Sequence, residues 1–523
     1  MTLDDPVTRP LFDGSDWTFE LMGTVHDAIE EIALNDLGLD VYPNQIEIIS
    51  AEQMLDAYSC VGLPLMYQHW SFGKHFVRDE TYYRKGMMGL AYEIVINSNP
   101  CISYNMEENT MAMQTLVMAH AAFGHNHFFK NNYLFQDWTD AAGIHDYLAF
   151  AKNFIADCEE RYGLDEVERV LDAAHALRDQ GVFRYGRPPK PTAEELQAMQ
   201  RQREGHESQR SVLDLWTDAT LGETREEVSV EDRAISSRQS ALNLPQENLL
   251  YFLEKHSPVL EAWQREILRI VRYLAQYLYP QKQTKVMNEG CATFSHYYII
   301  HRLYEKGLIT QGALMEMMHS HTNVIMQPEF DDPRFSGLNP YALGFAMMMD
   351  IRRICENPTE EDRDWFPEFA GNPDWKSVLL QAWANYRDES FILQFLSPKL
   401  MRDFKLFVIT DDAKSPELVV SQIHNRQGYR EIRRLLAKSY DLAYQEPDIQ
   451  VTDADLKGDR ELKLTHQMLD GIDLVDADRA EVLKHIKALW GYEVSMTGVN
   501  RETGAKVYSV STRAPEGMDP EKA

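Results

Sequence analysis

Residues 107–129 read EENTMAMQTLVMAHAAFGHNHFF, a stretch whose apolar residues recur with the period of a helix. Two acids, Glu107 and Glu108, stand at its start, where carboxylates interact favourably with the helix dipole. Three histidines, His120, His125 and His127, follow among apolar neighbours. The stretch therefore predicts a buried helix that carries either a functional site or core histidines whose hydrogen bonds are satisfied within the protein.

Helical periodicity extends over most of the chain around this stretch. It predicts helices at 15–36, 51–60, 146–160, 164–180, 246–279, 286–305, 310–325 and 340–355, with Asp16 as N-cap of the first and Pro280 closing the fifth. The β-branched residues of LAYEIVINSNP, at 90–100, are typical of a strand that ends in a turn. We expect a mainly helical region at about 10–400, with a polar surface excursion at 186–240 that includes a solvent-facing helix at 192–204.

The pattern changes in the last part of the chain. It predicts strands at 404–411, 448–453, 460–467 and 492–499, and helices at 427–439 and 476–489. We expect a small α+β domain at 401–512 with largely antiparallel strands, followed by a disordered tail at 513–523. The predicted fold class is mainly α with a small α+β C-terminal domain.

Composition limits the possible partners and compartments. The 523 residues include 52 Lys and Arg against 82 Asp and Glu, a net charge of −30 that repels phosphate backbones and anionic lipids. Five scattered cysteines form no CxxC pair, as expected of reduced thiols. Since neither a signal peptide nor an apolar run of about 18 residues is found, we expect a cytoplasmic protein without nucleic-acid or membrane partners. The P-loop and GxSxG motifs are also absent.

The spacing of the histidines constrains how they could bind a metal. His120 and His125 are five residues apart, about 140° around a regular helix, so they would not share a face. A π-bulge near Gly124 would restore a shared face, and a helix that ended at Gly124 would free His125 to turn inward. His127 shares a face with His120 but stands about 10 Å along the axis, an awkward distance for two ligands of one ion.

A second motif, NEGCATFSH at 288–296, could complete the site. Gluzincin-like metallopeptidases take their third zinc ligand from a glutamate on a downstream helix, and Glu289 could act in this way with His120 and His125. We therefore treat a zincin-like arrangement of the helical region, holding a divalent metal with zinc as the first candidate, as a hypothesis. His296 lies two turns further along the same face and could orient a ligand or contact substrate. The alternative is a helix start at which Glu289 offsets the dipole.

Other candidates surround these two motifs. The segment 67–76, YQHWSFGKHF, places His69, Trp70 and His75 where they could line a pocket, to which His127 could also belong, although such aromatic clusters also form cores. Glu108 could orient a histidine or act as a base. The pair His319 and His321 is a weaker candidate.

One departure from the zincin pattern affects catalysis. Ala121 occupies the position directly after the first histidine, where a zincin carries its general base. A hydrolase built on this chain would need a base from elsewhere, such as Glu107, Glu108 or Glu289.

Several long motifs resemble the SpoVR family, named after stage V sporulation protein R. They are YPNQIEIISAEQMLDAYS (42–59), YQHWSFGKHF (67–76), GLAYEIVINSNPCISY (89–104), MEENT (106–110), HAAFGHNHFFKNNYLF (120–135), PQKQTKVMNEG (280–290) and GYREIRRLLAKSYDL (428–442). The resemblance runs from about residue 15 to 510. The chain departs from the family at Cys291 and Ser295, where tryptophan is expected, so the wall beside Glu289 differs.

The resemblance implies a cellular role and no particular reaction. It implies a stress, sporulation and cell-envelope module concerned with peptidoglycan and the spore cortex, in which a PrkA-type serine protein kinase and a von Willebrand-like protein are partners. Two main hypotheses follow for this chain: a metal-dependent hydrolase-like site, or a non-catalytic interaction or regulatory protein with a buried polar network in the same place. A sensor that binds a small ligand in the aromatic pocket is a third.

Overall fold

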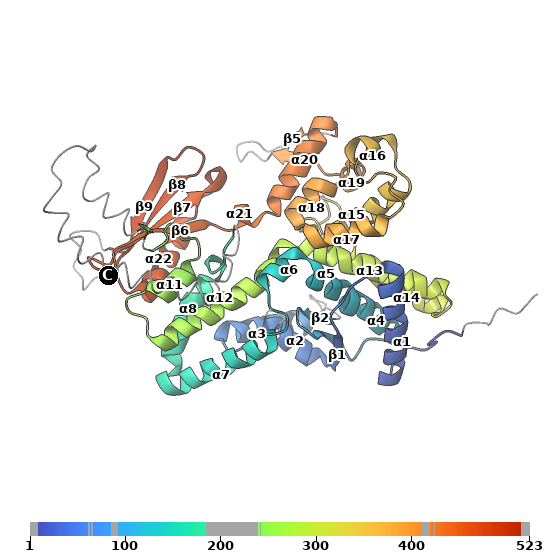
Figure 1. The fold of residues 1–523 in the computed structure, drawn as a ribbon, viewed down its shortest axis with the longest axis horizontal. Helices are drawn as coiled ribbons and strands as arrows, with labels where there is room; N and C mark the ends of the chain where they lie inside the picture. The colour runs from blue at the N-terminus through green and yellow to red at the C-terminus, as the bar shows by residue number, and fades with distance from the viewer. Residues whose placement is uncertain are drawn as a thin grey trace, which may run out of the picture. The chain divides into compact units, whose positions relative to one another are not determined.

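A computed structural model describes residues 9–60, 63, 66–84, 93–184, 239–240, 242–410, 419–422 and 424–513 (Figure 1). Most of the predicted surface excursion at 186–240, with its helix at 192–204, lies outside the described residues, as does the predicted tail after its first residue. Contacts group the described residues into two compact units. One runs to Asp172 and resumes from Tyr273 to Glu446, and the other contains Ala173–Arg272 and the chain from Pro447 onward.

The first unit is mainly helical, as predicted. Its helices are α1 (Phe19–Glu31), α2 (Ala51–Ser59), α3 (Trp70–Arg84), α4 (Met111–Val117), α5 (Asn126–Asn131), α6 (Tyr133–Trp138), α7 (Ile144–Tyr162), α13 (Lys285–Glu305), α14 (Gln311–Val324), α15 (Pro340–Glu356), α16 (Glu360–Trp365), α17 (Trp375–Asn385), α18 (Asp388–Phe395), α19 (Pro398–Asp403), α20 (Arg426–Ser439) and α21 (Leu442–Gln445). Two π-helical segments, η1 (Ile32–Leu37) and η2 (Met118–His125), continue α1 and α4. Helices α8 (Leu164–Ala176) and α12 (Ala262–Gln283) contribute residues to both units.

Three details of the helix prediction were wrong. The N-cap of α1 is Thr18, not Asp16, because Thr18 has the extended backbone that an N-cap needs and its side chain accepts a hydrogen bond from the Leu21 amide. Pro280 does not close its helix but lies inside α12. The hydroxyl of Thr284 donates to the Pro280 carbonyl at 2.8 Å, which ties down the turn that follows the proline. The predicted helix at 246–279 is also divided, into α11 (Leu249–His256) and α12.

Close helix packing around α13 organises the core of the first unit. Gly290 of α13 meets Gly344 of α15 so closely that a Cβ on Gly290 would stand 2.7 Å from the Gly344 backbone. On η2, a Cβ on Gly124 would stand 2.5 Å from Cα of Ala292 in α13. Small residues thus allow α13 to contact both neighbours at backbone distance, within one continuous apolar core.

The first unit also contains a three-stranded sheet. Its strand order is β1 (Asn44–Ile49), β3 (Cys101–Met106), β2 (Glu93–Ile96). Strands β1 and β3 are parallel, and β2 and β3 antiparallel. The sequence predicted only the strand that contains β2. A short antiparallel pair, β4 (Val408–Thr410) and β5 (Val419–Gln422), lies later in the same unit.

The C-terminal sheet belongs to the second unit and has the order β6 (Asp448–Ala454), β7 (Leu462–Met468), β8 (Val494–Asn500), β9 (Lys506–Ser511). Its outer pairs are antiparallel, but β7 and β8 are parallel because α22 (Asp476–Trp490) makes the crossover between them. The predicted fold class, mainly α with a small α+β C-terminal part, is confirmed, and β9 is an additional strand. Helix α11 and the short 3₁₀ turns η3 (Arg178–Gln180) and η4 (Leu469–Gly471) also belong to the described part of this unit. Among the described helices, none is both long and apolar enough to cross a membrane.

Candidate metal centre

The π-helical segment η2 brings His120 and His125 onto one face. A π-helix bonds each residue to the one five positions away, so residues five apart become neighbours on its surface. The structure thus adopts the first of the two alternatives that the spacing left open. The two imidazole rings lie with centroids 4.7 Å apart, at 89° to one another. Both side chains are almost completely buried.

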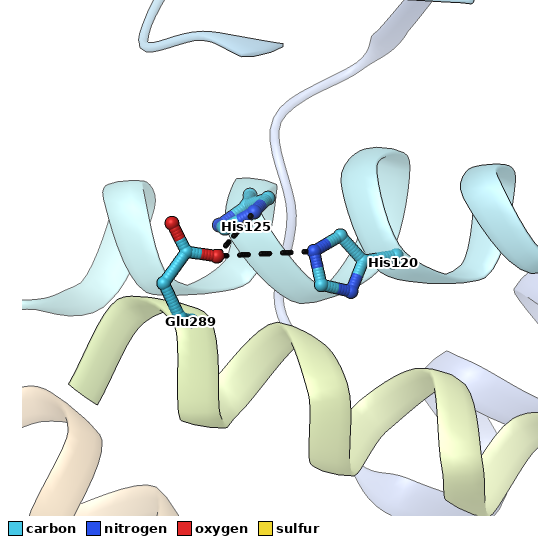
Figure 2. Close-up of side chains that lie close together, drawn as sticks. All are labelled: His120, His125 and Glu289. Atoms are coloured by element: carbon cyan, nitrogen blue, oxygen red, sulfur yellow. Dashed lines mark ion pairs between the residues drawn. The ribbon is translucent and has the colours of Figure 1, made fainter. Parts of the chain in front are cut away.

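Glu289 of α13 faces this pair, as Figure 2 shows. One of its carboxylate oxygens, Oε2, lies 3.6 Å from Nε2 of His125 and 4.0 Å from Nε2 of His120. Together the three side chains offer one ligand atom each, all within 4.8 Å of one another. The structure therefore brings together the two histidines and the glutamate that the sequence proposed as metal ligands.

The residues present fit a divalent metal ion. Distances of 3.6 and 4.0 Å are too long for hydrogen bonds, and Oε2 of Glu289 is buried without a hydrogen-bond partner. Ligands about 2.1 Å from a tetrahedral zinc ion stand about 3.4 Å from one another, close to the separations between these atoms. Two imidazoles and one carboxylate are also a ligand set of catalytic zinc sites, which leave one position open.

Hydrogen bonds to the far side of each ring direct the Nε2 atoms into the site. Nδ1 of His125 lies 2.9 Å from Oδ1 of Asn288, and because an amide oxygen only accepts, His125 carries its proton on Nδ1. Nδ1 of His120 lies 2.9 Å from Nδ1 of His296. Both contacts leave Nε2 free to face Glu289, which is the orientation that a metal ligand needs.

A second carboxylate, Glu93 of β2, reaches the same site and was missed by the sequence reasoning. Its Oε1 lies 3.6 Å from Nε2 of His120. Burial and the nearby charge of Glu289 raise the pKa of Glu93 to about 8. The sequence does contain a signal that could have indicated Glu93, because it is an acid within an apolar, β-branched strand. Burying an acid there is costly unless it is paired or has a function.

Tyr341, near the start of α15, was also missed. Its ring stacks beside that of His120 at 6.5 Å and 19°. Burial, with the charges of Glu289 and Glu93, raises the pKa of Tyr341, so this phenol remains protonated near the two carboxylates.

The remaining candidates fall in several places. His296 is buried between His120 and His321, while His319 is exposed. Glu108 is exposed in the turn after β3, together with Glu107, and is not among the buried residues of the cluster.

His127 contacts a different part of the unit. Its Nδ1 accepts from the Asp40 amide at 2.9 Å, and its ring packs edge-on against Trp383. This contact ties the loop before β1 to α5, which is a structural role.

The aromatic segment lines a separate pocket of about 690 Å³ between α2, α3, α7 and α8. His69 and the half-exposed Trp70 both line it, and both contact Oδ1 of Asp172, at 3.1 and 2.7 Å. His75 is partly buried on α3 and, like His127, is not among the residues that line this pocket.

The geometry defines a mainly helical protein with a buried site of two histidines and one glutamate on adjoining helices. Comparison with known proteins then gives its family. The chain matches the family described as SpoVR like protein over residues 16–445, and the SpoVR-like C-terminal domain over 447–501, so it belongs to the SpoVR family. It is 55% identical over 496 residues, 95% of each chain, to a protein of Escherichia coli (strain K12) named "Uncharacterized protein YcgB". No solved structure matches the chain.

Proposed function

We propose that this SpoVR-family protein binds a divalent metal ion, with zinc as the first candidate, through His120, His125 and Glu289, and uses it for hydrolysis. The observation that supports this most is the orphaned Oε2 of Glu289, which faces two imidazole Nε2 atoms at distances too long for hydrogen bonds. A buried carboxylate oxygen without a partner is costly, and a cation would remove that cost.

The other residues of the site have distinct roles in this proposal. A bound ion would polarise a substrate carbonyl and lower the pKa of a water molecule. Glu93 lies beside the ligands, with Oε1 3.6 Å from Nε2 of His120, and its carboxylate would take the proton of that water molecule and pass it to the leaving group. This supplies, from β2, the base that Ala121 cannot provide. Glu93 replaces Glu108, which is exposed, and His296 orients His120.

Family membership supports a proposal about the cellular setting. We place the protein in the cytoplasm, in a bacterial stress, sporulation and cell-envelope module concerned with peptidoglycan. A PrkA-type serine protein kinase and a von Willebrand-like protein are its proposed partners. Purification of the tagged chain from its own host should recover both, and their absence from the recovered complex would remove this part of the proposal.

A non-catalytic interaction or regulatory protein is the second candidate. It is favoured by the hydrogen bonds of the buried histidines to one another, since a polar network that satisfies itself needs no ion. Under this alternative, the buried polar network would be structural and would stabilise a surface that partners bind.

Elemental analysis of the purified, tag-free protein separates the two candidates. The wild type is compared with the His120→Ala/His125→Ala double variant and with His319→Ala, an exposed histidine that serves as a matched control. Near-stoichiometric zinc, iron or manganese in the wild type and the control, lost in a double variant with unchanged circular dichroism, is the expected result. No metal in any of the proteins after metal-supplemented growth without chelators would overturn the metal proposal.

A further inference from the structure

Three buried histidines from three different elements form a continuous hydrogen-bonded chain. Nδ1 of His120, on η2, lies 2.9 Å from Nδ1 of His296, on α13. Nε2 of His296 then lies 2.8 Å from Nδ1 of His321, on α14. All three residues are at most 5% exposed. The chain begins at a proposed metal ligand and ends against the rings of Tyr297 and Phe345.

Each contact of this chain joins two ring nitrogens at hydrogen-bond distance, so one nitrogen of each pair carries the proton and the other offers a lone pair. A neutral imidazole has one N–H and one lone pair, so the tautomer of each ring fixes the tautomer of the next.

Only two arrangements satisfy both hydrogen bonds. In the first, His120 donates from Nδ1 to His296, and His296 donates from Nε2 to His321. This leaves the Nε2 lone pair of His120 facing Glu289 and places the proton of His321 on Nε2. In the second, both bonds run in the opposite direction, so that His120 presents Nε2–H to Glu93 and Glu289, and His321 carries its proton on Nδ1.

We propose that His296 and His321 are positioning residues that hold His120 in the tautomer a metal requires, and that a bound cation sets the direction of the whole chain. This inference rests on the proposed metal site. A cation beside Nε2 of His120 excludes the second arrangement, since it needs the lone pair there. Without the cation the second arrangement is favoured, because it directs the positive end of the Nε2–H dipole, and not a lone pair, towards the carboxylates of Glu93 and Glu289, at 3.6 and 4.0 Å. The tautomer of His321 therefore reports whether the site is filled, although His321 does not contact the ion.

Zinc affinity in the full-length protein, measured by competition with a chromogenic chelator, tests the positioning role. His321→Leu removes the acceptor for His296 and should weaken zinc binding about 10- to 100-fold, the usual effect of losing an outer partner of a ligand. His321→Asn should restore most of the affinity, because its amide oxygen can accept from Nε2–H of His296 without added charge. His319→Leu, on the exposed face of the same helix, is the control and should bind as the wild type does.

The tautomers can also be measured directly, which avoids variants that fold poorly. In protein labelled with 15N-histidine, the nitrogen shifts of His321 should change from the Nδ1–H to the Nε2–H pattern when zinc is added. Unchanged shifts in a wild type that binds zinc, or equal affinities of the Leu and Asn variants, would overturn this inference and leave the metal site standing. A wild type that binds no zinc would overturn both.

Discussion

Gly124 of η2 lies against Ala292 of α13 at backbone distance, and a Cβ built on the glycine would stand 2.5 Å from Cα of Ala292 and 3.0 Å from its Cβ. This contact fixes how the two helices that carry the proposed ligands pack. His125 follows Gly124 directly, and Glu289 lies one turn before Ala292 on α13. Close packing at one point therefore sets the 3.6 Å approach of His125 to Glu289.

Gly124→Ala should separate these helices and weaken the site. The added methyl meets backbone, which cannot rotate away, so we expect the free energy of unfolding to fall by about 1–3 kcal/mol. Urea denaturation monitored by circular dichroism measures this change. Gly23→Ala in α1 is the control, since nothing lies within 4 Å of its added Cβ, and it should raise stability by about 0.5–1 kcal/mol. If Gly124→Ala were as stable as wild type, the two helices could adjust and the contact would not be the determinant we describe.

Metal binding should stabilise the wild type but not a Glu289→Gln variant. An ion that binds only the folded state adds about 2.7 kcal/mol when its free concentration is 100 times Kd. Glu289→Gln removes the carboxylate charge while keeping its shape, so the variant should unfold at the same temperature with zinc as with EDTA. Differential scanning calorimetry with zinc and with EDTA measures both effects. A zinc-dependent shift of equal size in the variant would show that the stabilising ion binds elsewhere.

The grouping of the three proposed ligands could be predicted from the sequence, but the full cluster around them could not. His120, His125 and Glu289 are recognisable because ionisable residues stand out among apolar neighbours in helical patterns. The five-residue spacing left two geometries open, and only packing against α13 selects the π-helical one. Glu93 is brought in by the pairing of β2 with β3, a contact between strands that periodicity along one segment does not reveal.

In the fold, as in the site, elements with a local sequence signal were predicted, and those that depend on contacts between distant segments were missed. Long amphipathic helices such as α13 and α15 were predicted nearly to their ends, because their signal is local. Strand β1 was missed, since its pairing with β3 links residues more than fifty positions apart. The parallel pairing of β7 with β8 likewise depends on the crossover through α22 and not on either strand alone.

Asn288 should control the affinity of the metal site without contacting the ion. Its Oδ1 accepts from Nδ1 of His125 at 2.9 Å and so keeps Nε2 directed towards Glu289. Asn288→Leu removes this acceptor, and we expect zinc affinity to fall about 10- to 100-fold, as is typical for outer partners of a ligand. Chelator competition measures the change. Asn323→Leu, at an exposed position of α14, is the control. Equal affinities of the two variants would mean that His125 is oriented by other contacts.

The carboxyl group of Asp388 should make the free energy of unfolding depend on pH, and the substitution Asp388→Asn should remove this dependence. Asp388 is the first residue of α18, and its buried carboxylate lies against the start of α13. There it accepts hydrogen bonds from the Val286 and Met287 amides at 2.8 and 2.9 Å. Burial raises the pKa of Asp388 to about 7, against 3.8 for the free group, although the hydrogen bonds oppose this shift.

The sign of the effect follows from the raised pKa. The folded protein holds the Asp388 proton more tightly than the unfolded chain, so the stability from this group is complete below its unfolded pKa of 3.8 and is lost as pH rises through about 7. Asp388→Asn still accepts through its amide oxygen but does not titrate. Between about pH 5 and pH 8 the free energy of unfolding of the wild type should therefore fall by on the order of 1–4 kcal/mol more than that of the variant. Urea titrations of metal-free protein at several pH values measure this difference, with the exposed cap variant Asp374→Asn as control. Parallel stability curves for wild type and Asp388→Asn would mean that the Asp388 carboxylate is ionised in the folded protein throughout that range.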